Sequence, residues 1–190
     1  MSIFIDEDTK VLVQGITGRE ASEKVPEMIE YGTEVAAGVT PGKGGQEVEG
    51  VPVYDTVREA LSEYPDINTS LIYVPPFAAK DAIFEALENG IKTLNVITER
   101  IPTKDAWQIY EKVQEHSATM VGPTSVGIIS PGKAKLGPIG GSEPEKVYEE
   151  GKVGVISKSG GMTTETSWVV RQAGYGVSTA AGLGGDVIAG

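Results

Sequence analysis

Short apolar runs alternate along the chain with segments whose apolar residues recur at helical spacing. The runs predict strands at residues 10–14, 35–39, 51–53, 69–74, 93–97 and 119–121. The intervening segments predict helices at residues 19–31, 57–64, 79–87 and 103–113. Such regular alternation predicts an α/β fold, in which a doubly wound and mainly parallel sheet is covered by helices on both faces.

The pattern changes after residue 121. The segment Gly122–Gly141 is rich in Gly, Pro and Ser and is predicted to be loop. Beyond it, strands predicted at 153–157 and 177–181 flank a helix predicted at 161–173. We therefore expect a first domain over residues 1–121, a loop-rich linker over 122–151, and the first βαβ elements of a second, truncated α/β domain over 152–190. The glycine-rich stretch 182–190 is expected to lead into the rest of that domain or to form an active-site loop.

Proline and tryptophan give two local expectations. The segment 19–31 should be helical at least from Pro26, because proline is tolerated in the first turn of a helix and is costly further inside. Trp107 and Trp168 fall at helical spacing, and we expect both in the core rather than stacked on a ligand.

Composition narrows the function classes. The net charge of −11 disfavours a nucleic-acid partner, which would need many Lys and Arg side chains against phosphates. The chain has no cysteine and one histidine, His116, so a Cys- or His-based metal site is not expected. The start of the chain lacks the features of a secretory signal, and no apolar run approaches the length of about 20 residues that spans a membrane. We expect a cytoplasmic protein without a membrane association.

The most informative stretch is the turn Gly15-Ile16-Thr17-Gly18 between the first strand and its helix. A glycine turn at this place lets main-chain N–H groups approach a phosphate at the helix N-terminus, as in a Rossmann-like fold. An NAD site would need an acidic residue at the end of the second strand, where Thr40 stands, followed by Lys43. This pattern favours, over NAD, a ligand that carries phosphates away from a free adenosine ribose; an ordinary exposed loop lysine is the alternative interpretation of Lys43.

A second anion site is conceivable at Ser159-Gly160-Gly161, between a predicted strand and a predicted helix. Its hydroxyl and main-chain N–H groups could bind an anion at the positive helix end, or serve only as an ordinary cap.

Several blocks together resemble the family of nucleoside-diphosphate-forming acyl-CoA synthetases, which contains the α subunit of succinyl-CoA synthetase and ATP-citrate lyase. The blocks are Gln14-Gly15-Ile16-Thr17-Gly18, Tyr31-Gly32-Thr33, Gly38-Val39-Thr40-Pro41-Gly42-Lys43-Gly44-Gly45, Tyr73-Val74-Pro75, Ile97-Thr98-Glu99 and Gly184-Gly185-Asp186. The resemblance covers essentially the whole chain.

The resemblance implies a Rossmann-like domain that binds coenzyme A, with the residues of the site at matching positions. Thr17, Gly18, Arg19 and Glu20 would line the turn at the CoA diphosphate, and Lys43 would contact a CoA phosphate. Val74, Pro75, Ile97, Thr98 and Glu99 would flank the rest of the cofactor. Ser159, Gly160 and Gly161 would begin the helix that receives a phosphorylated histidine, and Thr124, Ser125 and Thr164 fall in blocks near the phosphate or substrate.

In this family a β subunit with an ATP-grasp domain binds the nucleotide and Mg²⁺ and phosphorylates a histidine of a second, flavodoxin-like domain. That histidine is absent from this chain, since His116 is not at its position, so we expect CoA binding without turnover. The blocks at Gly122–Gly127 and Ser159–Glu165 look like the citrate branch, which leaves succinate and citrate both open as the acid. Arg19-Glu20-Ala21 lacks a glycine that the family has in the CoA turn. A non-catalytic CoA-binding module is the main alternative, and an NAD-dependent oxidoreductase is a weaker one.

Overall fold

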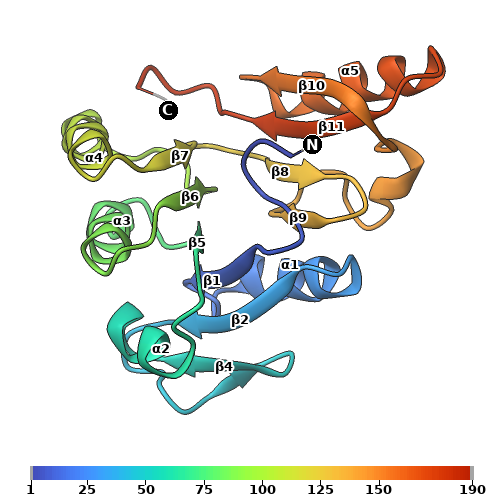
Figure 1. The fold of residues 1–190 in the computed structure, drawn as a ribbon. Coiled ribbons are helices and arrows are strands. Elements are labelled where there is room, and N and C mark those ends of the chain that lie inside the picture. The colour runs from blue at the N-terminus through green and yellow to red at the C-terminus, as the bar shows by residue number, and fades with distance from the viewer. Residues whose placement is uncertain (1, 189–190) are drawn as a thin grey trace.

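The computed structural model describes residues 2–188 and contains two sheets (Figure 1). The larger sheet has seven strands in the order β3-β4-β2-β1-β5-β6-β7. Their bounds are β1 Lys10–Gln14, β2 Glu34–Val39, β3 Glu47–Val48, β4 Val51–Tyr54, β5 Thr69–Ile72, β6 Thr93–Val96 and β7 Thr119–Val121. All neighbours in it are parallel except the β3–β4 pair.

The helices of this part follow the strands in alternation. They are α1 Arg19–Glu30, α2 Val57–Glu63, α3 Ala79–Glu88 and α4 Thr103–Glu115. With β3 set aside, the order of the remaining strands reverses between β1 and β5, as it does in Rossmann-like sheets. The predicted α/β fold with a doubly wound, mainly parallel sheet is therefore confirmed. Within residues 2–188, the structure has no helix with the length and apolar character needed to cross a membrane.

The strand side chains alternate between two buried clusters, one on each face of the large sheet. Leu12 and Ile72 pack with α2, α3 and α4, whereas Val11 and Leu71 pack with α1 and with strands of the second sheet. Both faces of β1 and β5 are thus covered, which explains why the sequences of these strands are continuous apolar runs. The arrangement leaves the carboxyl ends of the strands as the open edge.

The second sheet corrects the prediction for Gly122–Gly141. Two short strands lie in this segment, β8 Gly127–Ser130 and β9 Ala134–Leu136, and they form an antiparallel pair. Together with β10 Glu150–Ser157 and β11 Val177–Gly182 they make a four-stranded sheet in the order β10-β11-β8-β9, packed by α5 Gly160–Gln172. A 3₁₀ turn, η1 Pro144–Lys146, precedes β10. The division into domains stays a prediction.

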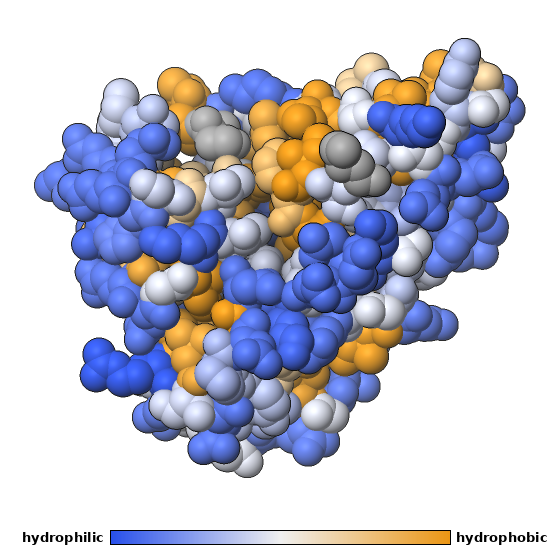
Figure 2. Space-filling view, viewed as in Figure 1, coloured by the Kyte–Doolittle hydropathy of each residue, from blue (hydrophilic) through white to orange (hydrophobic). Residues whose placement is uncertain are grey.

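The helix predicted over residues 19–31 is present from Arg19 to Glu30, so Pro26 lies in its interior rather than in its first turn. The prediction for the two tryptophans is wrong. Trp107 and Trp168 are 56% and 42% exposed, because smaller residues such as Ala106 and Ser167 form the buried faces of their helices. Hydrophilic residues cover most of the face shown in Figure 2, and apolar residues form patches between them.

The segment before β1 is bound to the second sheet. The amide of Ile3 donates to Oγ1 of Thr179 in β11 at 3.1 Å, and the hydroxyl of Ser130 in β8 donates to the carbonyl of Ile5 at 2.7 Å. The side chain of Ile5 is 2% exposed and packs between the two sheets with Val11. Residues near the start of the chain thus join elements formed much later in the sequence.

A buried lysine also joins the second sheet to helix α1. The Lys135 side chain on β9 is fully buried, and its Nζ donates to the carbonyl of Gly141 at 2.5 Å and lies 3.4 Å from Oε2 of Glu27 on α1. Burial lowers the pKa of Lys135 despite the nearby carboxylate. Burial would raise the pKa of Glu27, but the hydrogen bond from Lys24 and the charge of Lys135 lower it below its usual range.

Candidate functional site

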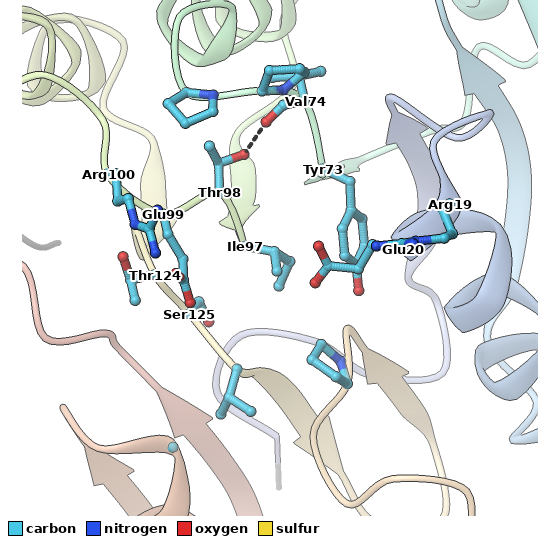
Figure 3. Close-up of a pocket in the computed structure, with 15 residues that line it drawn as sticks. Arg19, Glu20, Tyr73, Val74, Ile97, Thr98, Glu99, Arg100, Thr124 and Ser125 are labelled. Carbon is cyan, nitrogen blue, oxygen red and sulfur yellow. Dashed lines mark hydrogen bonds between the residues drawn. The ribbon is translucent and has the colours of Figure 1, made fainter.

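A cleft with a cavity volume of about 860 Å³ opens at the carboxyl ends of β1, β5, β6 and β7 (Figure 3). This is the edge where the strand order reverses, the place where open α/β sheets bind ligands. The second sheet supplies the opposite wall. The residues that line the cleft are Arg19, Glu20, Tyr73, Val74, Pro75, Pro76, Ile97, Thr98, Glu99, Arg100, Thr124, Ser125, Val126, Pro138 and Gly160.

The glycine turn after β1 brings α1 to the cleft. Gly15 has a φ of +82°, and a Cβ there would lie 3.1 Å from the main chain of Tyr73 and Val74, so only glycine fits. Gly18 then caps α1 without a side-chain hydrogen bond. The N–H groups in the first turn of α1 are therefore free to donate hydrogen bonds to a ligand, and the N-terminus of the helix adds a partial positive charge.

Thr17 and Lys43 lie outside the lining of the cleft. Oγ1 of Thr17 donates to Oγ1 of Thr40 at 3.2 Å, which fixes the glycine turn to the end of β2. Lys43 is exposed on the loop after β2, and it takes part in none of the ion pairs found within residues 2–188. Its ammonium group is thus available to a ligand that extends past the turn.

The middle of the cleft is apolar and firmly held. Val74 and Pro75 follow β5, and Ile97 follows β6. Oγ1 of Thr98 donates to the carbonyl of Val74 at 2.7 Å, which ties the two strand ends together (Figure 3). This wall suits an extended, weakly polar chain rather than a compact charged group.

Tyr73 adds a polar atom to this wall. Its hydroxyl is buried and has no hydrogen-bond partner within the described part of the chain. Burial raises the pKa of Tyr73, and the charges of Glu20 and Glu27 raise it further. The phenol therefore stays neutral and can donate a hydrogen bond within the cleft.

Two arginines stand at separate places on the rim, Arg19 on α1 and Arg100 after β6 (Figure 3). Within residues 2–188, neither takes part in an ion pair or in a side-chain hydrogen bond, although Glu20 and Glu99 also border the cleft. An otherwise acidic protein thus offers two unneutralised cations to a ligand. Such guanidinium groups bind phosphates and carboxylates through paired hydrogen bonds.

Arg100 and Thr124 both have a left-handed backbone, with φ values of +59° and +60°. This conformation costs a non-glycine residue on the order of 1 kcal/mol. The neighbouring hydrogen bonds, such as that from the Thr124 amide to the carbonyl of Thr98 at 3.0 Å, hold it in place. Two of the four non-glycine residues with a positive φ among the described residues thus border the cleft, and the other two, Glu49 and Ser117, lie elsewhere.

Ser125 connects the two sheets rather than facing a ligand. Its Oγ accepts from Nδ2 of Asn95 at 2.9 Å and from the amide of Gly127 at 2.9 Å, and it donates to the carbonyl of Gly182 at 2.6 Å. A hydroxyl has one donor and two acceptor positions, so all of its hydrogen-bonding capacity is used. The Ser125 amide also donates to the carbonyl of Val96 at 3.1 Å, so Ser125 keeps no free donor for the predicted contact with phosphate or substrate.

Replacing Ser125 with alanine is expected to lower the free energy of unfolding by about 2 kcal/mol, because three buried polar groups lose a partner. Urea unfolding measures the loss. The control is Ser62→Ala, which removes an exposed helical hydroxyl bonded to the Arg58 carbonyl and should change stability by less than about 0.5 kcal/mol. Equal stabilities of the two variants would contradict the assigned network.

The predicted second anion site begins α5. Oγ of Ser159 accepts from the Met162 amide at 3.3 Å as an ordinary cap, and Oγ1 of Thr164 lies 3.2 Å from the Tyr148 hydroxyl. Gly160 lines the cleft, and a Cβ there would lie 2.9 Å from Cβ of Val126. Gly161 is exposed beside it. The N-terminus of α5 thus reaches the cleft through Gly160.

The structure brings together most of the residues named from the sequence. Thr17, Gly18, Lys43, Ser159, Gly161 and Thr164 lie outside the lining, whereas the other ten predicted residues lie in it. Sequence reasoning missed Tyr73, Pro76, Arg100, Val126 and Pro138. Tyr73 precedes the predicted residue Val74 and Arg100 follows the predicted residue Glu99, so extending each predicted set by one residue would have found them. No group of three or more residues able to hold a metal ion is found within residues 2–188.

The strand order and the cleft at its reversal define a Rossmann-like domain that suits a phosphate-bearing ligand. Residues 6–100 match the CoA binding domain family. The chain is 50% identical over 191 residues to the ADP-forming succinate–CoA ligase subunit alpha 2 of Archaeoglobus fulgidus. It is 47% identical over 193 residues to a subunit of the ADP-forming sulfoacetate–CoA ligase of an Acholeplasma species. Each match covers 100% of this chain and 64% of the relative.

A solved structure of ATP citrate lyase from Methanothrix soehngenii, in complex with citrate and coenzyme A, has the same fold. It superposes with a TM-score of 0.86 at 23% identity, over 98% of this chain and 33% of that chain. The present chain belongs to the CoA-binding domain family. It spans somewhat less than two thirds of the length of these curated relatives.

Proposed function

We propose that this chain is the CoA-binding part of the α subunit of an acyl-CoA ligase that forms ADP or GDP. The observation that carries the proposal is the cleft at the strand-order reversal, bordered by the uncapped first turn of α1. The amides at Arg19 and Glu20 would hold the CoA diphosphate. Val74, Pro75 and Ile97 would flank the pantetheine arm, and Lys43 would contact an outer phosphate.

The rest of the reaction would depend on parts outside residues 1–190. An acid, CoA and a nucleoside triphosphate would give acyl-CoA, nucleoside diphosphate and phosphate through a phosphohistidine. The nucleotide and Mg²⁺ would be bound by a β subunit with an ATP-grasp domain. His116 caps the end of α4, with Nδ1 at 3.0 Å from the Lys112 carbonyl, and it does not line the cleft. We place the assembly in the cytoplasm.

The acid would be succinate, citrate or a similar small acid with more than one anionic group. The similarity to succinate–CoA and sulfoacetate–CoA ligase subunits supports this range. The second candidate function is a CoA-binding module without catalysis. The two differ in whether the gene encodes a histidine-bearing domain after residue 190.

Calorimetric titration with CoA tests the proposal. We expect saturable binding to this chain that weakens about tenfold in Lys43→Ala, because one charge-assisted contact is lost. The matched control is Lys152→Ala, which removes an exposed lysine of β10 that does not line the cleft, and it should leave the affinity unchanged.

Dephospho-CoA and NAD complete this test. If Lys43 contacts the 3′-phosphate, dephospho-CoA should bind equally to wild type and Lys43→Ala. NAD should not bind, because Thr40 stands at the end of β2 in place of an acidic residue. Binding of NAD without binding of CoA would refute the proposal and favour an oxidoreductase.

A further inference from the structure

We propose that Arg100, with the hydroxyl of Thr124, forms a subsite for the second anionic group of the acid substrate, the group that does not react with CoA. This inference rests on the proposed function and adds to it a residue that determines specificity. The acids it predicts carry a carboxylate or a sulfonate in addition to the reacting carboxylate.

The backbone of Arg100 is the first argument. Its φ of +59° is a conformation that glycine adopts without strain, yet this position carries a long, charged side chain. The side chain is exposed at the cleft and contributes nothing to the buried clusters. Glu49 and Ser117 share this conformation away from the cleft, so the backbone of Arg100 supports a role in ligand binding through its combination with a place in the cleft lining.

The surroundings of Arg100 are the second argument. Figure 3 shows Arg100, Glu99 and Thr124 together at one side of the cleft, whereas Arg19, Glu20 and Tyr73 stand at the other. Within residues 2–188, the Arg100 guanidinium has no ion pair, even with its neighbour Glu99, and the Thr124 hydroxyl has no hydrogen bond. Hydrogen-bond donors that follow two different strands, β6 and β7, are therefore free to bind an anion.

The order of the strands is the third argument, because it separates this subsite from the CoA phosphates. The α1 turn follows β1, Arg100 follows β6 and Thr124 follows β7. In the order β1-β5-β6-β7, neighbouring strands are about 4.8 Å apart, so β6 and β7 lie about 10 and 14 Å from β1. If the diphosphate occupies the α1 turn and pantetheine follows the apolar wall, the thiol arrives at the side of Arg100.

Guanidinium chemistry selects the ligand class. The planar fork of arginine makes two parallel hydrogen bonds to a carboxylate, and sulfonate oxygens offer the same acceptors. An acid whose only carboxylate reacts with CoA would leave the Arg100 guanidinium without an anionic partner. The site should therefore prefer succinate, sulfoacetate or citrate to butyrate, which has the length of succinate without its second charge.

The test is an NMR titration of the ¹⁵N-labelled chain, first with CoA and then with each acid in the presence of saturating CoA. In the wild type, the three multiply charged acids should shift the signals of the Thr124 amide and the Arg100 side chain, and butyrate should bind about tenfold more weakly. Arg100→Gly should weaken the multiply charged acids about tenfold and leave butyrate and CoA unchanged. Arg100→Lys should restore part of the affinity.

Arg100→Gly is suited to this test because glycine relieves the local strain, so the variant should unfold at a temperature no lower than the wild type. If CoA does not bind, the proposed function fails. If CoA binds but Arg100→Gly leaves acid binding unchanged, or if no acid binds, only the present inference fails. If Arg100→Gly weakens CoA as strongly as the acids, Arg100 belongs to the CoA site and the inference is likewise overturned.

Discussion

Replacing Gly127 with alanine is expected to lower the free energy of unfolding by about 4 kcal/mol, which is among the larger effects of single substitutions. Gly127 begins β8 with a φ of +113°, a conformation that L side chains rarely adopt. An added Cβ would overlap the carbonyl oxygen of Leu136 in the paired strand β9. The main chain of a buried hairpin would have to move, because no flexible side chain can yield instead.

Urea unfolding of Gly127→Ala and Gly161→Ala measures this effect against a matched control. Gly161 lies in the first turn of α5, and the nearest atom to its added Cβ is Oγ of Ser159 at 4.0 Å. Alanine should there be neutral or stabilising by up to about 1 kcal/mol, because glycine is a poor helix former. A loss below about 1 kcal/mol in Gly127→Ala would show that β8 and β9 do not pair as described.

Glu27→Gln is expected to cost about 3 kcal/mol, because it leaves the buried charge of Lys135 without its carboxylate partner. Adding Lys135→Met to this variant should recover most of the loss, since no buried charge then remains. The control is Glu143→Gln, which breaks an ion pair with Lys146 whose side chains are 64% and 69% exposed. An exposed pair of this kind contributes less than about 1 kcal/mol. Equal losses in the two Gln variants would contradict the role given to Lys135.

Because Lys135 is buried, the free energy of unfolding depends on pH in a defined direction. Burial lowers the pKa of Lys135 below its ordinary value of 10.5 in the folded chain, so the unfolded chain binds this proton more tightly. The cost of burying the charge is fully present at neutral pH and is relieved as the pH rises through the lowered pKa toward 10.5. Wild type should therefore gain stability relative to Lys135→Met as the pH rises, and tyrosine ionisation cancels in this difference.

The large sheet could be predicted because the sequence patterns that specify its strands and helices are local. Buried parallel strands produce continuous apolar runs, as in Lys10–Gln14 and Thr69–Ile72, and helices with one buried face separate them. Strands β8 and β9 could not be found in this way, since they are three or four residues long and stand among glycines and prolines. The pairing of β8 with β11 joins residues about fifty positions apart, which no local sequence pattern can indicate.

The site was predictable where the main chain defines it. Gly15 and Gly18 mark the turn, and the residues after β5 and β6 follow from the rule that ligands bind at carboxyl strand ends. The hydrogen-bond partners of the individual side chains could not be predicted. The sequence does not reveal that the Ser125 hydroxyl is saturated by Asn95, Gly127 and Gly182, because these partners come from both sheets.

The contacts of Ile3 and Ile5 with the second sheet bear on the order in which the chain folds. The Ile3 amide meets Thr179, 176 residues later, and the Ile5 carbonyl meets Ser130, 125 residues later. During synthesis the strands of the large sheet can pair before these partners have left the ribosome. The first residues made are therefore among the last to reach their native place, and contacts so distant in sequence favour slow folding.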